Sequence, residues 1–310
     1  MAHEPFESYL PPRQRRRRSG DLDEDGVFNA TDRDRFEAMR TIPTELIVDD
    51  RPPEGDRWSI WDQSEPLQRG PEPHPEWIIT DAGAVDYELG VLKTGKEADV
   101  VLLERAVPGT GRTSLLASKR YRSTEHMMFH RSAEYTASRT TRRSRDQRAV
   151  NRKSNFGREV ASVQWATAEF DALKRLYTAG VPVPYPVQIV GREILMEFIG
   201  SERTAAPRLA EIRPDPDELA NLWDQACDAV VRMTELGYAH GDLSAYNIVV
   251  DEGRLVVIDL PQIVDLYMNP NGADFLVRDV ANLGSWFTAR GLEQTALDAL
   301  LSEVLAVAVL

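Results

Sequence analysis

Residues 240–259 read HGDLSAYNIVVDEGRLVVID, and this stretch decides the fold and the chemistry that we expect. Asp242 and Asn247 lie five positions apart in a predicted tight loop, and Asp259 follows two short predicted strands that flank a turn at 251–253. A carboxylate that accepts a hydroxyl proton stands near a metal ion without binding it, whereas an amide oxygen and a second carboxylate are ligands that Mg²⁺ prefers. The pattern predicts Asp242 as the base and Asn247 and Asp259 as metal ligands.

Taken singly, Asp242 and Asn247 are also ordinary turn residues. The hairpin and the aspartate that ends it, at this interval, favour the functional interpretation of the three together. His240 precedes them, and we expect it to brace the loop by hydrogen bonding rather than to take part in catalysis.

Upstream, Glu169 falls on the apolar face of a helix predicted over 163–179, four residues from both Trp165 and Leu173. Burying an ionised carboxylate without a partner costs on the order of several kcal/mol, so a cation is expected beside it. Lys119, near the end of the predicted strand SLLASKRY, is the natural candidate. Such a pair would direct Lys119 toward the phosphates of a nucleotide. The alternative is a Glu169 side chain that reaches the surface.

A glycine turn lies between two predicted strands before that lysine. Residues 90–96 match G-x-x-x-x-G-K, but Glu97 stands where a P-loop carries a hydroxyl residue, and a strand follows instead of a helix. We therefore reject a P-loop NTPase. The turn is better suited to cover a triphosphate, with Gly95 permitting close backbone approach and Lys96 available to a phosphate.

Three regions follow from the change of composition along the chain. Residues 1–75 are rich in Pro, Arg, Asp and Glu and are predicted to be a mostly disordered leader. Residues 76–199 are predicted to form a small antiparallel β lobe, interrupted by a basic flexible loop over 123–158. Residues 200–310 are predicted to form a mainly helical lobe with the catalytic and metal loops. The fold class is thus α+β, with two lobes.

Composition limits the classes of function. The net charge of -13 argues against a mainly electrostatic nucleic-acid binder. Two basic stretches, around Arg15 and over 139–158, are predicted to be solvated arms, with contact to RNA through 139–158 as the alternative. No membrane span or secretory signal is visible, so we expect a cytoplasmic protein. Cys227, the only cysteine, is predicted to be a structural thiol.

These motifs resemble a known family. TGKEADV, ASKRYR, WATAEFDALKRLYTAGVPVP, ILMEFIG, HGDLSAYN and VIDLPQ, in this order, are similar to the RIO-type atypical serine/threonine kinases, nearest to their RIO1 branch, over about residues 85–290. HGDLSxYN followed by IDxxQ is the specific part. The resemblance implies the two-lobed protein-kinase-like fold and an ATP-dependent kinase that needs Mg²⁺ or Mn²⁺, without the usual activation segment and peptide-docking subdomains.

The resemblance also implies the site residues. Asp242 would be the catalytic aspartate, Asn247 and Asp259 would bind metal, and Asp259 would also be able to accept a phosphoryl group. Lys119 would bind the phosphates. The residues implied for the phosphate loop and the adenine hinge are Thr94, Gly95, Lys96, Glu97, Ala98 and Val100, and Met196, Glu197 and Phe198.

The sequence departs from this pattern at three positions. Ala245 stands where RIO1 relatives usually carry glutamate, and Leu260 and Pro261 replace their usual Val-Ser. The protein substrate therefore stays unknown, and autophosphorylation is expected. An ATPase switch that docks on a ribonucleoprotein, or the ribosome, through 139–158 is the second hypothesis. A small-molecule kinase of the aminoglycoside or choline type is the third, and the TGKEA turn and IDLPQ argue against it.

The last residues, LLSEVLAVAVL over 300–310, are markedly apolar for a chain end. We expect them to pack on the helical lobe, with a dimer contact as the alternative.

Overall fold

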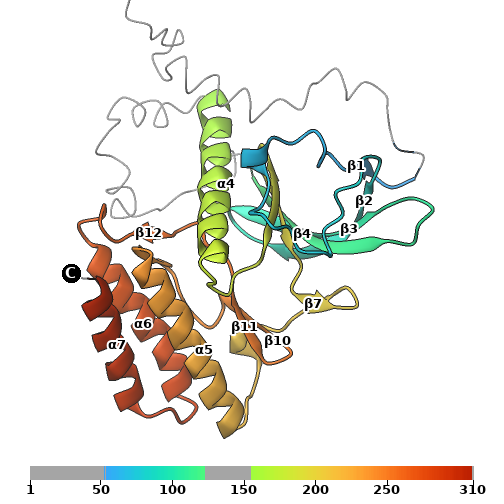
Figure 1. The fold of residues 1–310 in the computed structure, drawn as a ribbon. Helices are drawn as coiled ribbons and strands as arrows, with labels where there is room; N and C mark the ends of the chain where they lie inside the picture. The colour runs from blue at the N-terminus through green and yellow to red at the C-terminus, as the bar shows by residue number, and fades with distance from the viewer. Residues whose placement is uncertain (1–51, 53, 123–154, 309–310) are drawn as a thin grey trace, which may run out of the picture.

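The computed structural model describes residues 52, 54–122 and 155–308, and within the last range the side chains from residue 162 on. A β-sheet formed mostly by the first half of the chain lies beside a group of helices formed by the second half, and helix α4 stands against the sheet (Figure 1). The predicted two-lobed α+β fold is confirmed.

The sheet has six antiparallel strands in the order β1-β2-β3-β4-β6-β5. Its strands are β1 Arg57–Trp58, β2 Val85–Thr94, β3 Ala98–Ala106, β4 Thr113–Tyr121, β5 Pro186–Val190 and β6 Glu193–Glu197. The predicted glycine turn joins β2 to β3, and Gly95 N donates to Ala98 O at 2.9 Å. In the ladder, Lys119 lies opposite Val100 on one side and Ile194 on the other, so its backbone is fixed in the middle of the sheet.

The sheet part begins earlier in the chain than residue 76, where we expected it to start. Strand β1 pairs with β2, and a 3-10 helix, η2 (Pro66–Gln68), follows it. Trp61 is 4% exposed, and Tyr185 donates its hydroxyl hydrogen bond to Pro71 O at 2.8 Å. A few anchors of this kind order a Pro-rich segment whose average composition indicates disorder. Residues 1–51 and 53 of the predicted leader lie outside the described residues.

Helix α4 spans Asn155–Thr178 and packs against β4, β5 and β6. It begins inside the segment 123–158 that we expected to be a loop; residues 123–154 of that segment lie outside the described residues. The helix ends within one residue of the predicted boundary at 179, and Gly180 then has φ 77°, which a residue with a side chain rarely adopts.

The helical part contains a 3-10 helix, three α-helices and three two-stranded ladders. They are η5 Leu209–Glu211, α5 Pro216–Glu235, α6 Gly272–Thr288, α7 Gln294–Ala308, β7 Gly200–Ser201 with β8 Thr204–Ala205, β9 Tyr238–Ala239 with β12 Val264–Asp265, and β10 Ile248–Asp251 with β11 Arg254–Val257. Asp215 caps the start of α5, because its carboxylate accepts from Glu218 N at 2.9 Å. Helix α5 then buries an apolar stripe from Leu219 to Met233.

One hydrophobic core joins α4 to the helical part. It includes Phe170 and Leu173 of α4, Trp223 of α5 and Phe287 of α6. The apolar chain end packs into the same core through Leu300, Val304 and Ala308 of α7, as expected.

Two further expectations concern single features. Burial raises the pKa of the half-buried Cys227 thiol to about 12, which favours the predicted structural role over a reactive thiolate. Within the described part of the chain, the helices fall short of the length and apolar character that crossing a membrane requires.

Candidate active site

A cavity of about 610 Å³ lies where the sheet meets the helical part. Its walls come from the β2–β3 turn, strand β4, helix α4, the segment after β6 and the loops that precede β10 and follow β11. The predicted site residues that line it are Gly95, Lys96, Glu97, Ala98, Val100, Lys119, Glu169, Met196, Glu197, Phe198, Asp242 and Asp259. Residues predicted from separate motifs thus share one cavity.

Lys119 is at the centre of the charged side of this cavity. Its ammonium nitrogen lies 2.6 Å from Glu169 Oε1 and 2.8 Å from Asp259 Oδ1. The expected contact between Lys119 and Glu169 is therefore present, and Glu169 is buried instead of reaching the surface. Asp259 enters the same network as a second anion.

The network shifts the pKa values of its members. Burial acts to lower the pKa of Lys119, but the neighbouring Glu169, Tyr121 and Asp259 raise it well above its ordinary value. Burial also acts to raise the pKa of Asp259, and the ammonium groups of Lys119 and Lys93 instead hold it well below the usual range for aspartate. Lys119 and Asp259 are both ionised at neutral pH.

The loop between β9 and β10 holds Asp242 and Asn247. Asp242 is exposed and lines the cavity, and its backbone oxygen accepts from Asn247 Nδ2 at 2.8 Å. His240 is buried; its Nε2 lies 3.1 Å from Ile258 O, and its Nδ1 accepts from Asp242 N at 3.4 Å. The geometry agrees with the expected bracing role of His240.

The hairpin β10–β11 brings Asn247 to Asp259. Ile258 N donates to Asn247 O at 2.9 Å, so the residue before Asp259 is bonded directly to Asn247. Asp259 itself has φ 67°, an unusual conformation that turns its side chain into the cavity toward Lys119. Asn247, predicted as a metal ligand together with Asp259, does not line the cavity.

These donors fit a divalent cation and a nucleotide. The Asp259 carboxylate is ionised, and Asn247 uses its amide nitrogen for Asp242 O, which leaves its amide oxygen as the group that can face a cation. Phosphates would meet the Lys119 ammonium group, while Val100, Ala117 and Leu173 give the cavity an apolar wall.

Comparison with known proteins agrees with this geometry. A sequence profile of the RIO domain matches residues 115–300, more than half of the chain. The chain belongs to the RIO family. The RIO-type serine/threonine-protein kinase Rio1 of Haloferax volcanii is 31% identical over 215 residues, which are 69% of this chain and 68% of that protein.

Two further relatives are longer proteins. The serine/threonine-protein kinase RIO3 of Caenorhabditis elegans is 32% identical over 221 residues, 70% of this chain and 39% of that protein. The serine/threonine-protein kinase RIO1 of Chaetomium thermophilum is 31% identical over 214 residues, 66% of this chain and 40% of that protein. The chain spans about two fifths of the length of these two relatives. The predicted RIO1-like kinase class is confirmed.

Three residues of this RIO kinase differ from the expected motifs, and each is either buried in the fold or lines the cavity. Ala245 is buried, and its backbone oxygen accepts from Ala210 N at 2.9 Å. Leu260 is fully buried and its backbone N–H donates to Glu169 Oε1 at 3.2 Å, while Pro261 lines the cavity. The substitutions thus leave the network of Lys119 intact.

Thr94, predicted as part of the phosphate loop, does not line the cavity of the RIO kinase. Its hydroxyl is instead one of the groups, after Arg122, that lower the pKa of Asp99. Because Thr94 is the last residue of β2, it sits opposite Asp99 in the ladder.

Three residues of the site were missed by sequence reasoning. Tyr121 donates its hydroxyl hydrogen bond to Glu169 Oε2, and Lys93 lies 3.4 Å from Asp259 Oδ2. Asp279, on α6, accepts from Gly241 N at 2.7 Å and from Leu243 N at 2.9 Å, so it clamps the backbone on both sides of Asp242. Burial raises the pKa of Asp279, against the opposing effects of His240 and these two N–H groups.

Proposed function

We propose that this RIO kinase transfers the γ-phosphoryl group of ATP to a serine or threonine hydroxyl, with Mg²⁺ or Mn²⁺ as the divalent ion. The observation that carries the proposal is the Lys119 ammonium group, held between Glu169 and Asp259 in the cavity that Asp242 faces. This is the arrangement that phosphoryl transfer requires of a fixed phosphate-binding cation and a nearby base.

ATP is proposed to lie with its adenine against the segment from Met196 to Phe198 and its phosphates toward Lys119. Glu197 N donates to Tyr185 O at 2.8 Å and Tyr185 N donates to the Glu197 carboxylate at 3.0 Å, so this segment is anchored from behind. Because the segment is already anchored, it can orient the adenine ring without losing conformational entropy when ATP binds. Gly95 and Lys96, in the turn above, are proposed to approach the phosphates.

Asp242 is proposed as the base. Among the described residues, no hydrogen bond or ion pair engages its exposed carboxylate, so this group is available to a substrate hydroxyl. Asp242 would accept the proton as the hydroxyl oxygen bonds to the γ-phosphorus and the bond from that phosphorus to the leaving oxygen of ADP breaks. A divalent ion held by Asn247 and Asp259 would supply positive charge to the phosphates.

Autophosphorylation is also proposed, on the ground of the kinase class. Contact with RNA or a ribosome through 139–158, and a cytoplasmic location, remain proposals that rest on composition, since residues 139–154 lie outside the described part of the chain.

The test is incubation of the purified protein with γ-labelled ATP and Mg²⁺ or Mn²⁺, alongside Asp242→Asn and Asp259→Asn. Asp251→Asn, at the end of β10 and outside the cavity lining, is the matched control. Acid-stable label that is lost in Asp242→Asn and kept in Asp251→Asn is the expected result. Hydroxylamine-labile label that depends on Asp259, with release of phosphate, would favour the ATPase switch, and absence of nucleotide binding would overturn both.

A further inference from the structure

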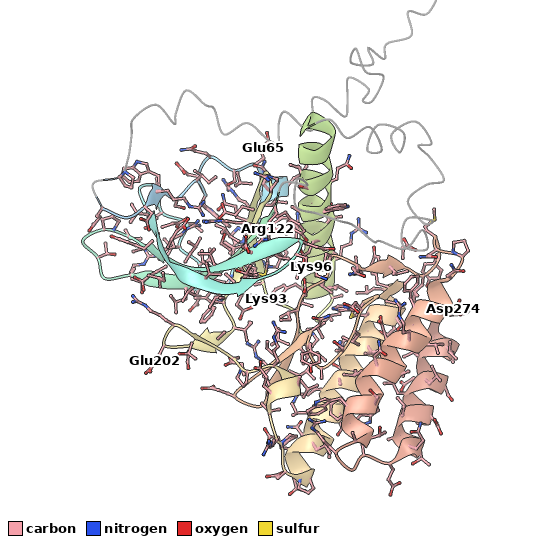
Figure 2. The ribbon with its side chains drawn as sticks, turned by 180° about the vertical axis from the view of Figure 1, so that it is seen from behind. Glu65, Lys93, Lys96, Arg122, Glu202 and Asp274 are labelled. Atoms are coloured by element: carbon pink, nitrogen blue, oxygen red, sulfur yellow. The ribbon has the colours of Figure 1, made fainter. Side chains whose placement is uncertain are left out.

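A second lysine reaches the proposed metal ligand. Lys93, one residue before the end of β2, places its ammonium nitrogen 3.4 Å from Asp259 Oδ2, while Lys119 contacts the other oxygen, Oδ1, at 2.8 Å. Both oxygens of one carboxylate are therefore engaged by different cations. Figure 2 labels Lys93 and Lys96 at the edge of the sheet that faces the helical part.

The two lysines differ in how firmly they are held. The side chain of Lys119 is 9% exposed and shares its charge with Glu169, whereas that of Lys93 is 40% exposed and its contact with Asp259 is longer. An exposed ion pair at such a distance contributes little and is readily exchanged, whereas the buried pair is fixed. Lys93 is thus the cation that can leave Asp259.

The charges of the four side chains in the cluster at Asp259 show why Lys93 would leave when a divalent ion and a nucleotide bind. Lys93 and Lys119 together balance Glu169 and Asp259, so the cluster has no net charge. Adding a divalent ion without a nucleotide would leave two excess positive charges in a partly buried site, which is unfavourable. Adding the ion with a triphosphate supplies the compensating negative charge.

We propose that Lys93 is a displaceable counter-ion of Asp259, which holds Oδ2 until a divalent ion arrives with the nucleotide and then turns to the phosphates. Lys93 thereby makes metal binding depend on nucleotide binding. The inference rests on the proposed function, because it takes Asp259 as a metal ligand. Lys96 lines the same cavity, yet the described structure shows no ion pair between it and Asp259, so it provides a comparison.

The experiment is titration of the nucleotide-free full chain with Mn²⁺, followed by the spectroscopic signal of the free ion. Lys93→Gln is expected to bind Mn²⁺ about five-fold more tightly than the wild type, because one opposing charge is removed. Lys93→Arg, which keeps the charge, and Lys96→Gln are expected to stay within about two-fold of the wild type. With a non-hydrolysable ATP analogue present, the gain of Lys93→Gln is expected to disappear.

Thermal unfolding of each variant without metal shows whether it is folded. Equal Mn²⁺ affinity of folded Lys93→Gln and wild type would overturn the inference and leave the proposed function standing, provided that Asp259→Asn loses Mn²⁺ binding. Unchanged Mn²⁺ binding in Asp259→Asn would overturn both, because the ion would then bind elsewhere. An equal gain in Lys96→Gln would also overturn the inference, since general electrostatics would account for it.

Discussion

The hydroxyl of Tyr121 donates a hydrogen bond to Glu169 on Oε2, the oxygen that Lys119 does not contact. Leu260 N donates to Oε1 as well, so three donors from β4 and from the segment after β11 hold one buried carboxylate. The carboxylate in turn holds Lys119. Tyr121 is therefore a positioning residue that acts on Lys119 through Glu169. Its ring also lies near Lys119, with the ring centroid 5.4 Å from the ammonium nitrogen.

Tyr121→Phe removes this hydroxyl and keeps the ring. We expect kcat to fall by about ten-fold, because Glu169 can then rotate and Lys119 is less well oriented, which corresponds to about 1.4 kcal/mol. KM for ATP is expected to change less than kcat. Steady-state kinetics with varied ATP separates the two constants.

Tyr185→Phe is the matched control, since it also removes a buried tyrosine hydroxyl that donates a hydrogen bond, in this case to Pro71 O outside the cavity. Both variants are expected to lose about 1 kcal/mol of stability. An equal effect of the two substitutions on kcat would mean that Tyr121 acts through general stability and not through Glu169.

Asp279→Asn is expected to weaken the clamp on the loop that carries Asp242. The neutral amide offers one acceptor to the N–H groups of Gly241 and Leu243 and turns donors toward them, which costs about 2–3 kcal/mol of stability. We expect a lower kcat at temperatures where the variant is fully folded. Chemical denaturation and kinetics on the same samples measure the two effects, and a stability loss with unchanged kcat would limit Asp279 to a structural role.

The parts of the site that were predicted from the sequence are those encoded by local spacing. Asp242, Asn247 and Asp259 lie within one loop and the hairpin after it, so their intervals alone indicate their proximity. Glu169 was found because a carboxylate on the apolar face of a helix requires a partner. The fold class followed from the order of strand and helix patterns.

The parts that were missed depend on contacts between residues far apart in the chain. Asp279 and Lys93 look like ordinary surface charges in sequence, and their roles appear only when α6 and β2 are placed beside the loops around Asp242 and Asp259. The start of the sheet was placed too late for a related reason. Composition averages over a Pro-rich segment and hides single apolar anchors such as Trp61.

Trp61→Ala tests whether this early segment is part of the folded unit. The side chain is 4% exposed and packs in a cluster with Leu103 and Tyr185, so its removal is expected to cost about 3 kcal/mol or more in the free energy of unfolding. Trp77→Ala, at a side chain that is 37% exposed, is the control, and its cost is expected to be about 1 kcal/mol. Urea denaturation measures both. Equal, small losses would show that residues before 76 contribute little to stability.

Glu193 gives the protein a contribution to stability that is lost in acid. Burial acts to raise its pKa, but two hydrogen bonds from Arg57, at 2.7 and 2.9 Å, and the contacts with Ser118 and Arg120 lower it from 4.5 to about 2. A carboxylate whose pKa is lower in the folded state stabilises the protein above the pKa of the unfolded chain. This contribution is therefore complete above pH 4.5 and is lost as the pH falls toward 2.

Glu193→Gln isolates this contribution from those of the other carboxylates. At pH 7 we expect the variant to be less stable than the wild type by about 2 kcal/mol, a value reduced for the partial exposure of the two arginines. The difference should narrow between pH 4.5 and 2, because Glu193 becomes neutral in the wild type and then resembles glutamine. Urea denaturation at a series of pH values measures the difference. A gap that stays constant down to the acid limit would mean that Glu193 acts by packing, and that its charge contributes nothing to the stability of the sheet.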